Sequence, residues 1–314
     1  MPGADNVSKL SIIIPTLNEE RHVGDLLSDV ASQTRMPDEV IVVDAGSVDD
    51  TAAVVRRFPL VRLLEGESPV ACGRNLGGRS ASGDVLIFLD ADTRLPARFL
   101  ESFLTEFERR RLDIACPLYV PYRSTLTIKG FHALFNLLTR AFQRTLPSGA
   151  GHCVAVRRDV FRESRGFDPG LKFDDIELIR RLSKGRRFGI VEEQVFVSDR
   201  RYRDQGTPRM ILRYALMALI FAFGKFAWAN RIEYEFGDHG HGRRRDDSQA
   251  AGGAGRRADG DLERHRSRER PAVRQPGSES RGFCPEQGRA RFPRGGDPDP
   301  ERRGDGGSRG RDRL

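Results

Sequence analysis

Cysteine is scarce in this sequence, and its spacing excludes two classes of small stabilised domain. The 314 residues include four cysteines, Cys72, Cys116, Cys153 and Cys284, and none of them stands in a closely spaced pair. A disulfide framework and a zinc knuckle both require paired cysteines. We therefore expect reduced thiols in a cytoplasmic protein.

Long apolar segments are also missing. Residues 1–9 contain no apolar stretch of the kind found in a signal peptide. The longest apolar run without a charge, residues 214–224, has eleven residues. Because a helix needs about 20 apolar residues to span a bilayer, we assign this run to a core helix or to an interfacial one.

The C-terminal quarter of the chain has too few apolar residues to build a core. Residues 241–314 contain 19 arginines, 13 acidic residues, 14 glycines and only 12 residues of the AVILMFWYC set. These charges supply +6 of the chain's formal +8, so residues 1–240 are nearly neutral. We expect a disordered tail over residues 237–314, after a body of about 240 residues that can bury one large core.

Apolar strand-like segments alternate with helical ones in the body. Strands are predicted at residues 10–14, 39–43, 60–64, 84–89, 114–120 and 188–197, and helices at 20–32, 49–58, 68–81, 96–111, 125–145, 174–184 and 207–234. Such alternation with short connections predicts an α/β fold, a Rossmann-like and mostly parallel sheet with helices on both faces. Ligands bind such sheets at the carboxyl ends of the strands.

Aspartates follow two of the predicted strands. Asp90 and Asp92 follow residues 84–89, and Asp44 follows residues 39–43. Aspartate is common in solvent-exposed turns, but here the two strand ends should meet at one edge of the sheet. Carboxylate oxygens suit Mg²⁺ or Mn²⁺, ions that also bind substrate phosphates. The sequence therefore favours a metal and phosphate site at this edge.

Four motifs occur in order along the chain: SIIIPTLNEE at residues 11–20, VVDAGSVDDT at 42–51, GRNLG at 73–77 and FLDAD at 88–92. Together they resemble the family 2 glycosyltransferases, which have the GT-A fold and use nucleotide-sugar donors. The resemblance continues less sharply through segments at 149–151, 157–161, 166–168 and 174–178, and it covers about residues 10–234.

The resemblance implies a role for each matching residue. Asp44 would accept hydrogen bonds from the base, usually uracil, Glu19 would lie near the ribose, and Arg74 near the diphosphate. Asp92 would bind the metal ion directly, and Asp90 would face both the ribose and the metal. The implied nucleotide-sugar site comprises Pro15, Thr16, Asn18, Glu19, Asp44, Gly46, Ser47, Arg74, Asn75, Asp90 and Ala91.

The resemblance also indicates the catalytic base. Asp175 matches the second position of the family's Glu-Asp pair, but Asp174 replaces the glutamate, so either aspartate remains a candidate. Asp174 and Glu177 also have the spacing of a helix capping box. Gly149, Gly151 and His152 are expected on the acceptor side. The chain lacks the family's Gln-x-x-Arg-Trp motif, which argues against a processive polymerase.

These residues predict an inverting, metal-dependent hexosyltransferase. A divalent cation and an arginine stabilise the charge of a leaving nucleoside diphosphate, and a carboxylate takes the proton of the acceptor hydroxyl. We expect a nucleotide-binding half at residues 10–120 and an acceptor-binding half at 121–206. At residues 207–236, cationic and aromatic residues predict an interfacial helix, a peripheral location at the inner face of the cell membrane, and a lipid or lipid-linked acceptor.

Two other functions fit parts of the sequence. A nucleotidyltransferase would carry a glycine-rich basic loop after the first strand, whereas residues 15–20 are acidic and lack glycine. A dinucleotide oxidoreductase would need a G-x-G-x-x-G motif there. The arginine-rich tail suggests nucleic-acid binding, but its 13 interspersed acids weaken any basic patch, so nucleic acid is disfavoured as a partner.

Overall fold

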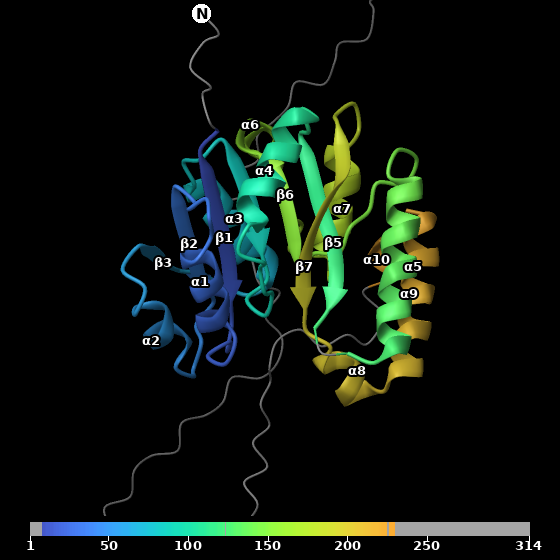
Figure 1. The fold of residues 1–314 in the computed structure, drawn as a ribbon, viewed down its shortest axis with the longest axis horizontal. Helices are drawn as coiled ribbons and strands as arrows, with labels where there is room; N and C mark the ends of the chain where they lie inside the picture. Colours follow the sequence, from blue (N-terminus) through green and yellow to red (C-terminus); the bar gives the residue numbers. More distant parts are fainter. Residues whose placement is uncertain (1–7, 123, 225, 230–314) are drawn as a thin grey trace, which may run out of the picture. The chain divides into compact units, whose positions relative to one another are not determined.

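The computed structural model describes residues 8–122, 124–224 and 226–229 (Figure 1). Within them, seven strands form one sheet in the order β3-β2-β1-β4-β6-β5-β7. The strands are β1 (Leu10–Thr16), β2 (Glu39–Asp44), β3 (Val61–Glu65), β4 (Val85–Leu89), β5 (Ile114–Pro121), β6 (Cys153–Arg157) and β7 (Phe188–Val197). The helices are α1 (Val23–Ala31), α2 (Thr51–Val55), α3 (Val70–Ser80), α4 (Phe99–Arg109), α5 (Leu126–Phe142), α6 (Arg158–Glu163), α7 (Asp174–Leu182), α8 (Arg200–Gln205), α9 (Thr207–Ala222) and α10 (Phe226–Ala229).

Both faces of the sheet are buried because the central strands carry apolar side chains on either side. Ile12 and Ile14 of β1 join a cluster with side chains of α1 and α4. Ile13, pointing the other way, joins a cluster with side chains of α3, α6 and α7. The predicted helices on both faces of an α/β sheet are therefore confirmed, and continuous apolar strands are what such burial requires.

The sheet is mostly parallel, as expected, but the sequence did not predict β6. β1 pairs in parallel with β2 and β4, β2 with β3, and β5 with β7. β6 lies antiparallel between β4 and β5. It has five residues and comes after the small-residue segment 148–151, and so short an apolar run cannot be identified as a strand from periodicity alone.

Three local expectations differ from the structure. β1 does not stop before Pro15 but continues to Thr16, which pairs in register with Asp44. The helix expected over residues 207–234 is interrupted at Gly224, whose φ is 68°, and residues 230–234 lie outside the described part. The capping box at Asp174 is wrong: Phe173 is the N-cap of α7, and no side-chain cap is found there among the described residues.

No helix in the described part of the chain is long and apolar enough to cross a membrane. Cys72, Cys116 and Cys153 are buried. Cys284 and the tail predicted over residues 237–314 lie outside the described residues.

Candidate active site

Three parallel strands end at one edge of the sheet and deliver the predicted nucleotide-binding residues there. Thr16, the last residue of β1, donates a hydrogen bond from Oγ1 to Asp44 Oδ1 at 3.1 Å, next to the end of β2. β4 ends at Leu89, and Asp90 follows it directly. Because β1 pairs in parallel with both β2 and β4, Asp44 and Asp90 lie at the same edge of the sheet.

The loops after β1 and β2 are tied to each other by side chains of the first two motifs. Asn18, in the left-handed region at φ 56°, accepts a hydrogen bond from the backbone of Val48 and donates its own backbone N–H to Ser47 Oγ. Ser47 in turn donates from its hydroxyl and its backbone N–H to the Asp44 carboxylate. Gly46 supplies the positive φ of 83° that this turn requires. The motif residues thus shape the loop as well as line it.

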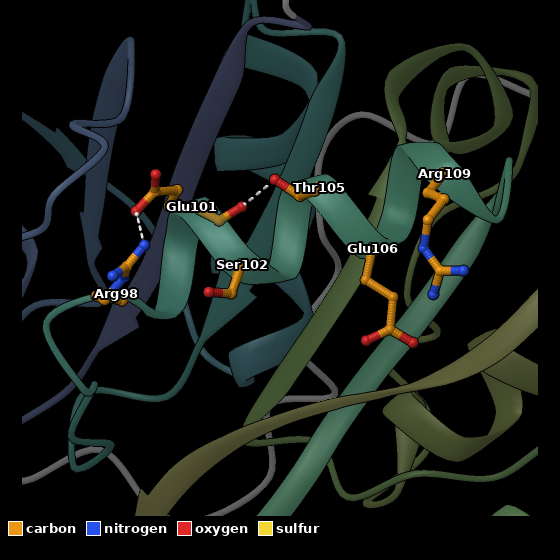
Figure 2. A pocket seen from close by; sticks show the side chains of 6 residues that line it. All are labelled: Arg98, Glu101, Ser102, Thr105, Glu106 and Arg109. Carbon is orange, nitrogen blue, oxygen red and sulfur yellow. Dashed lines mark hydrogen bonds and ion pairs between the residues drawn. The ribbon is translucent and has the colours of Figure 1, made fainter.

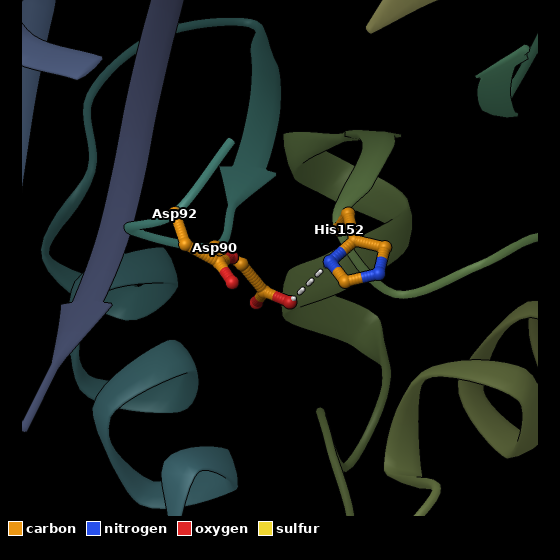
Figure 3. A group of neighbouring side chains, drawn as sticks. All are labelled: Asp90, Asp92 and His152. Atoms are coloured by element: carbon orange, nitrogen blue, oxygen red, sulfur yellow. Dashed lines mark ion pairs between the residues drawn. The ribbon is translucent and has the colours of Figure 1, made fainter. Parts of the chain in front are cut away.

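Asp90, Asp92 and His152 gather three metal-ligand atoms in one place (Figure 3). One candidate ligand atom from each of the three lies within 4.8 Å of the others, and His152 Nδ1 is 3.1 Å from Asp90 Oδ2. His152 arrives there through the antiparallel β6, since Asp90 N–H donates to the carbonyl oxygen of His152 at 3.1 Å. Within the described residues, this is the group of three or more His, Cys, Asp and Glu side chains with the spacing of a metal site.

Arg74 connects this group to the candidate base pair. Its guanidinium, on α3, donates from Nη2 to Asp90 Oδ1 at 2.7 Å and from Nη1 to Asp174 Oδ1 at 2.9 Å. Although burial alone would raise the pKa of Asp90, Arg74 and His152 lower that pKa well below its ordinary value. Asp90 is therefore ionised at neutral pH, and a carboxylate in that state is able to bind a cation.

The two aspartates at the start of α7 have different surroundings. Asp174 is buried, and its Oδ2 has no hydrogen-bond partner among the described residues. Asp175 is half-buried and lies against Gly151, where an added Cβ would be 2.2 Å from Asp175 Oδ2. Burial raises the pKa of both carboxyls, and Arg74 opposes that rise. Because Gly151 has no side chain, the Asp175 carboxylate has room beside it. Any other residue at this position would occupy that space.

Some predicted site residues have structural partners instead of open surfaces. Asn75 is buried, and its side-chain amide exchanges two hydrogen bonds of 2.8 Å with the backbone of Phe167. Gly149 packs against Cys116, whose Sγ would be 2.5 Å from an added Cβ. The Ala91 side chain is buried in the core cluster that also contains Leu89 and Leu95. The parts that these residues play in ligand binding remain predictions.

Tyr119 is a site-shaping residue that the sequence did not reveal. It is buried on β5, and its hydroxyl contacts the carbonyl oxygens of Ala150 and Cys153 at 2.5 and 2.9 Å. These contacts hold the turn that carries Gly151 and His152. A buried tyrosine hydroxyl needs a hydrogen-bond partner. This general rule is the only indication that the sequence offers for the role of Tyr119, and the rule does not say which group the partner is.

A hollow of about 400 Å³ lies elsewhere, along the outer side of α4 (Figure 2). Its lining is charged or polar throughout and comes from that helix and its N-cap: Arg98, Glu101, Ser102, Thr105, Glu106 and Arg109. None of the predicted site residues lines it. We therefore place the candidate site at the strand ends.

Comparison with known proteins agrees with the motifs. Residues 11–165 match the family model described as glycosyl transferase family 2. A 4,4'-diaponeurosporenoate glycosyltransferase of Staphylococcus aureus is 32% identical over 146 residues, which cover 43% of this chain and 37% of the relative. The validoxylamine A glucosyltransferase of Streptomyces hygroscopicus is 37% identical over 113 residues, covering 33% and 25%. The chain thus spans less than two fifths of the length of these curated relatives.

Solved structures show the same fold. The S. aureus protein TarS, residues 1–349 with UDP, aligns with a TM-score of 0.51 and 19% identity, over 60% of each chain. The mannosyltransferase PcManGT of Pyrobaculum calidifontis, with GDP-Man and Mn²⁺, aligns with a TM-score of 0.51 and 23% identity, over 60% of this chain and 56% of that one. The likeness shows a fold of the GT-A type.

Proposed function

The chain belongs to glycosyl transferase family 2 through residues 11–165, and from this premise we propose that it is an inverting glycosyltransferase. The proposed donor is a nucleoside-diphosphate sugar carrying UDP, and the proposed acceptor is a hydroxyl group on a lipid or lipid-linked molecule. The observation that carries the proposal is the chain of contacts from Asp90 through Arg74 to Asp174, with Asp175 beside it.

The donor side needs a group that stabilises the leaving diphosphate. The two carboxylates are oxygen ligands that suit both Mn²⁺ and Mg²⁺, and the imidazole favours the transition metal Mn²⁺ over Mg²⁺; Asp90, Asp92 and His152 would hold the ion. The bound ion supplies electrostatic stabilisation of the diphosphate charge. This assigns His152 to the metal side, in place of the acceptor side expected from the sequence. Arg74 adds a fixed positive charge next to Asp90.

The acceptor side needs a base, and we assign that role to Asp175. Asp174 is held by Arg74 through Oδ1 and is buried, so it positions Arg74, whereas the half-buried Asp175 faces Gly151. An acceptor hydroxyl would pass its proton to the Asp175 carboxylate while its oxygen attacks the anomeric carbon. Attack opposite the leaving diphosphate inverts that carbon, and no covalent enzyme intermediate forms.

Relatives support the substrate classes. TarS is described with UDP and with UDP-GlcNAc, and the mannosyltransferase with GDP-Man and Mn²⁺. The Staphylococcus relative is named for 4,4'-diaponeurosporenoate, which supports a lipid-like acceptor.

The test is a thermal-shift series with UDP, GDP, CDP and TDP, each with and without Mn²⁺. We expect UDP to raise the melting temperature only when Mn²⁺ is present, and Asp92→Asn to abolish that shift. NMR of the product formed from a UDP-sugar that the protein accepts as donor would then give the anomeric configuration of the transferred sugar. If no nucleoside diphosphate stabilises the protein, the proposed function is wrong, and retention of configuration would refute inversion alone.

A further inference from the structure

Helix α5 turns an apolar face outward. Its exposed large apolar side chains are Leu126 near the N-terminus and Leu134, Leu137, Leu138 and Phe142 in the second half, with Leu137 63% exposed. Ile128 and Phe135 of the same helix pack inward. A surface helix of a globular domain ordinarily points its polar face outward. The outward leucines of α5 therefore need another explanation.

Helix α9 lies beside α5 (Figure 1). Phe131 of α5 and Tyr214 of α9 stack with ring centroids 6.0 Å apart, and Met210 fills the space between the helices with Ile128. The exposed large apolar side chains of α9 and of the turn after it are spaced every three or four residues: Leu212, Leu216, Leu219 and Phe223. We refer to the exposed apolar side chains of both helices as the α5–α9 surface.

The charged residues of α5 and α9 themselves are all cationic. Residues 114–158 and residues 205–232 contain no aspartate and no glutamate. The described cations of the two helices are Lys129, Arg140, Arg209 and Arg213, of which Arg140 is paired with Glu192 at 2.6 Å. An apolar surface with only positive charges on its own elements is complementary to negatively charged headgroups above an acyl layer.

We propose that the α5–α9 surface docks on an anionic phospholipid bilayer. The two helices have 17 and 16 residues, and neither qualifies as a membrane span, so they would lie in the plane of the interface. The outward leucines and phenylalanines enter the boundary between headgroups and acyl chains, while Lys129 and Arg209 face lipid phosphates. The sequence pointed to the region of α9 alone, and the structure adds α5 as an equal part of the surface.

Docking brings the bilayer close to the candidate base. Phe221 of α9 packs on Phe173 with ring centroids 5.4 Å apart, and Asp174 and Asp175 follow Phe173 directly. An acceptor hydroxyl carried by a membrane lipid would therefore approach along the helix that adjoins Asp175. This consequence rests on the proposed function, whereas the docking itself does not.

The experiment measures co-sedimentation of the full chain with vesicles of phosphatidylcholine alone and with added phosphatidylglycerol. The test variant is Leu137→Glu combined with Leu216→Glu, both at exposed positions. The control is Leu60→Glu, an equally apolar residue that is 80% exposed next to β3, at the opposite edge of the sheet. Trp228, the single tryptophan of the chain and adjacent to α9, reports insertion through a blue shift of its emission.

We expect binding to the anionic vesicles with a blue shift, retained in Leu60→Glu and reduced at least 10-fold, without the shift, in the double variant. The arginine-rich residues 241–314 are the same in all variants, so binding that the double variant retains in full would be assigned to them and would overturn the proposal. Lack of vesicle binding by the wild type overturns it as well, as does a wild-type dimer that the double variant converts to monomer. The change in melting temperature caused by UDP and Mn²⁺ is measured separately from vesicle binding. Failure of docking and failure of the proposed transfer are therefore distinguishable.

Discussion

Arg74 and Asp174 stand 100 positions apart in the sequence, and a 2.9 Å hydrogen bond joins Nη1 of the arginine to Oδ1 of the aspartate. The same guanidinium holds Asp90 through Nη2. Although burial alone would lower the pKa of Arg74, the carboxyl groups of Asp174, Asp90 and Asp175 raise that pKa well above the ordinary arginine value. Arg74 is therefore the residue on which the electrostatic balance of the site depends.

Replacing Arg74 is expected to destabilise the whole domain. Arg74→Gln leaves the buried Asp174 carboxylate and the partly buried Asp90 carboxylate without their cation, and breaking a buried pair costs about 3–5 kcal/mol. The loss should shrink as the pH falls from 7.5 to 5, because the unpaired carboxyls then take up protons. Urea unfolding at both pH values measures it. Arg79→Gln, at an exposed position of the same helix, should stay within about 0.5 kcal/mol, and an equal loss in both variants would contradict the assignment.

Asp175→Asn should reduce kcat by about 10² to 10⁴-fold, because the amide keeps the shape of the side chain but cannot accept the proton. UDP binding in the presence of Mn²⁺ should be nearly unchanged. Asp174→Asn should lose less, since its Oδ1 can still accept a hydrogen bond from Arg74. Single-turnover rates and UDP affinities measure both. A larger loss in Asp174→Asn would move the base by one residue.

Gly151→Ala tests the close approach of Asp175. An added methyl group would be 2.2 Å from Asp175 Oδ2, so the carboxylate has to move, and a displacement near 1 Å can cost about 10²-fold in rate. Gly130→Ala on α5 is the matched control, because nothing lies within 4 Å of its added Cβ, and a helix gains up to about 1 kcal/mol from that change. Unaltered kcat in Gly151→Ala would separate this glycine from the base.

His152→Ala distinguishes metal binding from acceptor binding. If His152 is a metal ligand, the Mn²⁺ concentration that gives half-maximal activity should rise at least about 10-fold, as expected for loss of one of three protein ligands. EDTA should inactivate the wild type. A residue of the acceptor site would instead raise KM for the acceptor and leave the Mn²⁺ dependence unchanged, and that result would return His152 to the role expected from the sequence.

His132 predicts an acid-sensitive contribution to stability. Burial lowers the pKa of His132 to about 4, and its Nε2 is 3.1 Å from the hydroxyl of Tyr202. The unfolded chain, with a pKa near 6.5, binds the proton first, so this contribution is complete above pH 6.5 and is lost as the pH falls towards 4. Between pH 7.5 and 5, the free energy of unfolding of wild type should fall by about 1–2 kcal/mol more than that of His132→Gln. Equal pH dependence in both would exclude the effect.

The sequence by itself determined the first half of the sheet and the place of the site. β1, β2 and β4 are short, mostly apolar runs that alternate with helices over short connections, and this alternation is what predicts parallel strands. Parallel strands end at one edge, so Asp44 and Asp90 both lie at that edge, on either side of β1. The four ordered motifs lie within this half of the chain. Their residues and spacing can be read without knowing the tertiary structure, so they indicated the family.

Tertiary structure decided which side chains meet these aspartates. β6 carries His152 to Asp90 only because it inserts antiparallel between β4 and β5, and nothing in a five-residue apolar run states its partner or its direction. Asp174 and Glu177 had the pattern of a helix cap, but the Asp174 side chain binds Arg74, a residue 100 positions away that only the tertiary structure brings beside it. The exposure of the α5 leucines likewise cannot be predicted from the sequence. Periodicity shows that a helix face is apolar, but not whether that face packs on the core or is exposed on the surface.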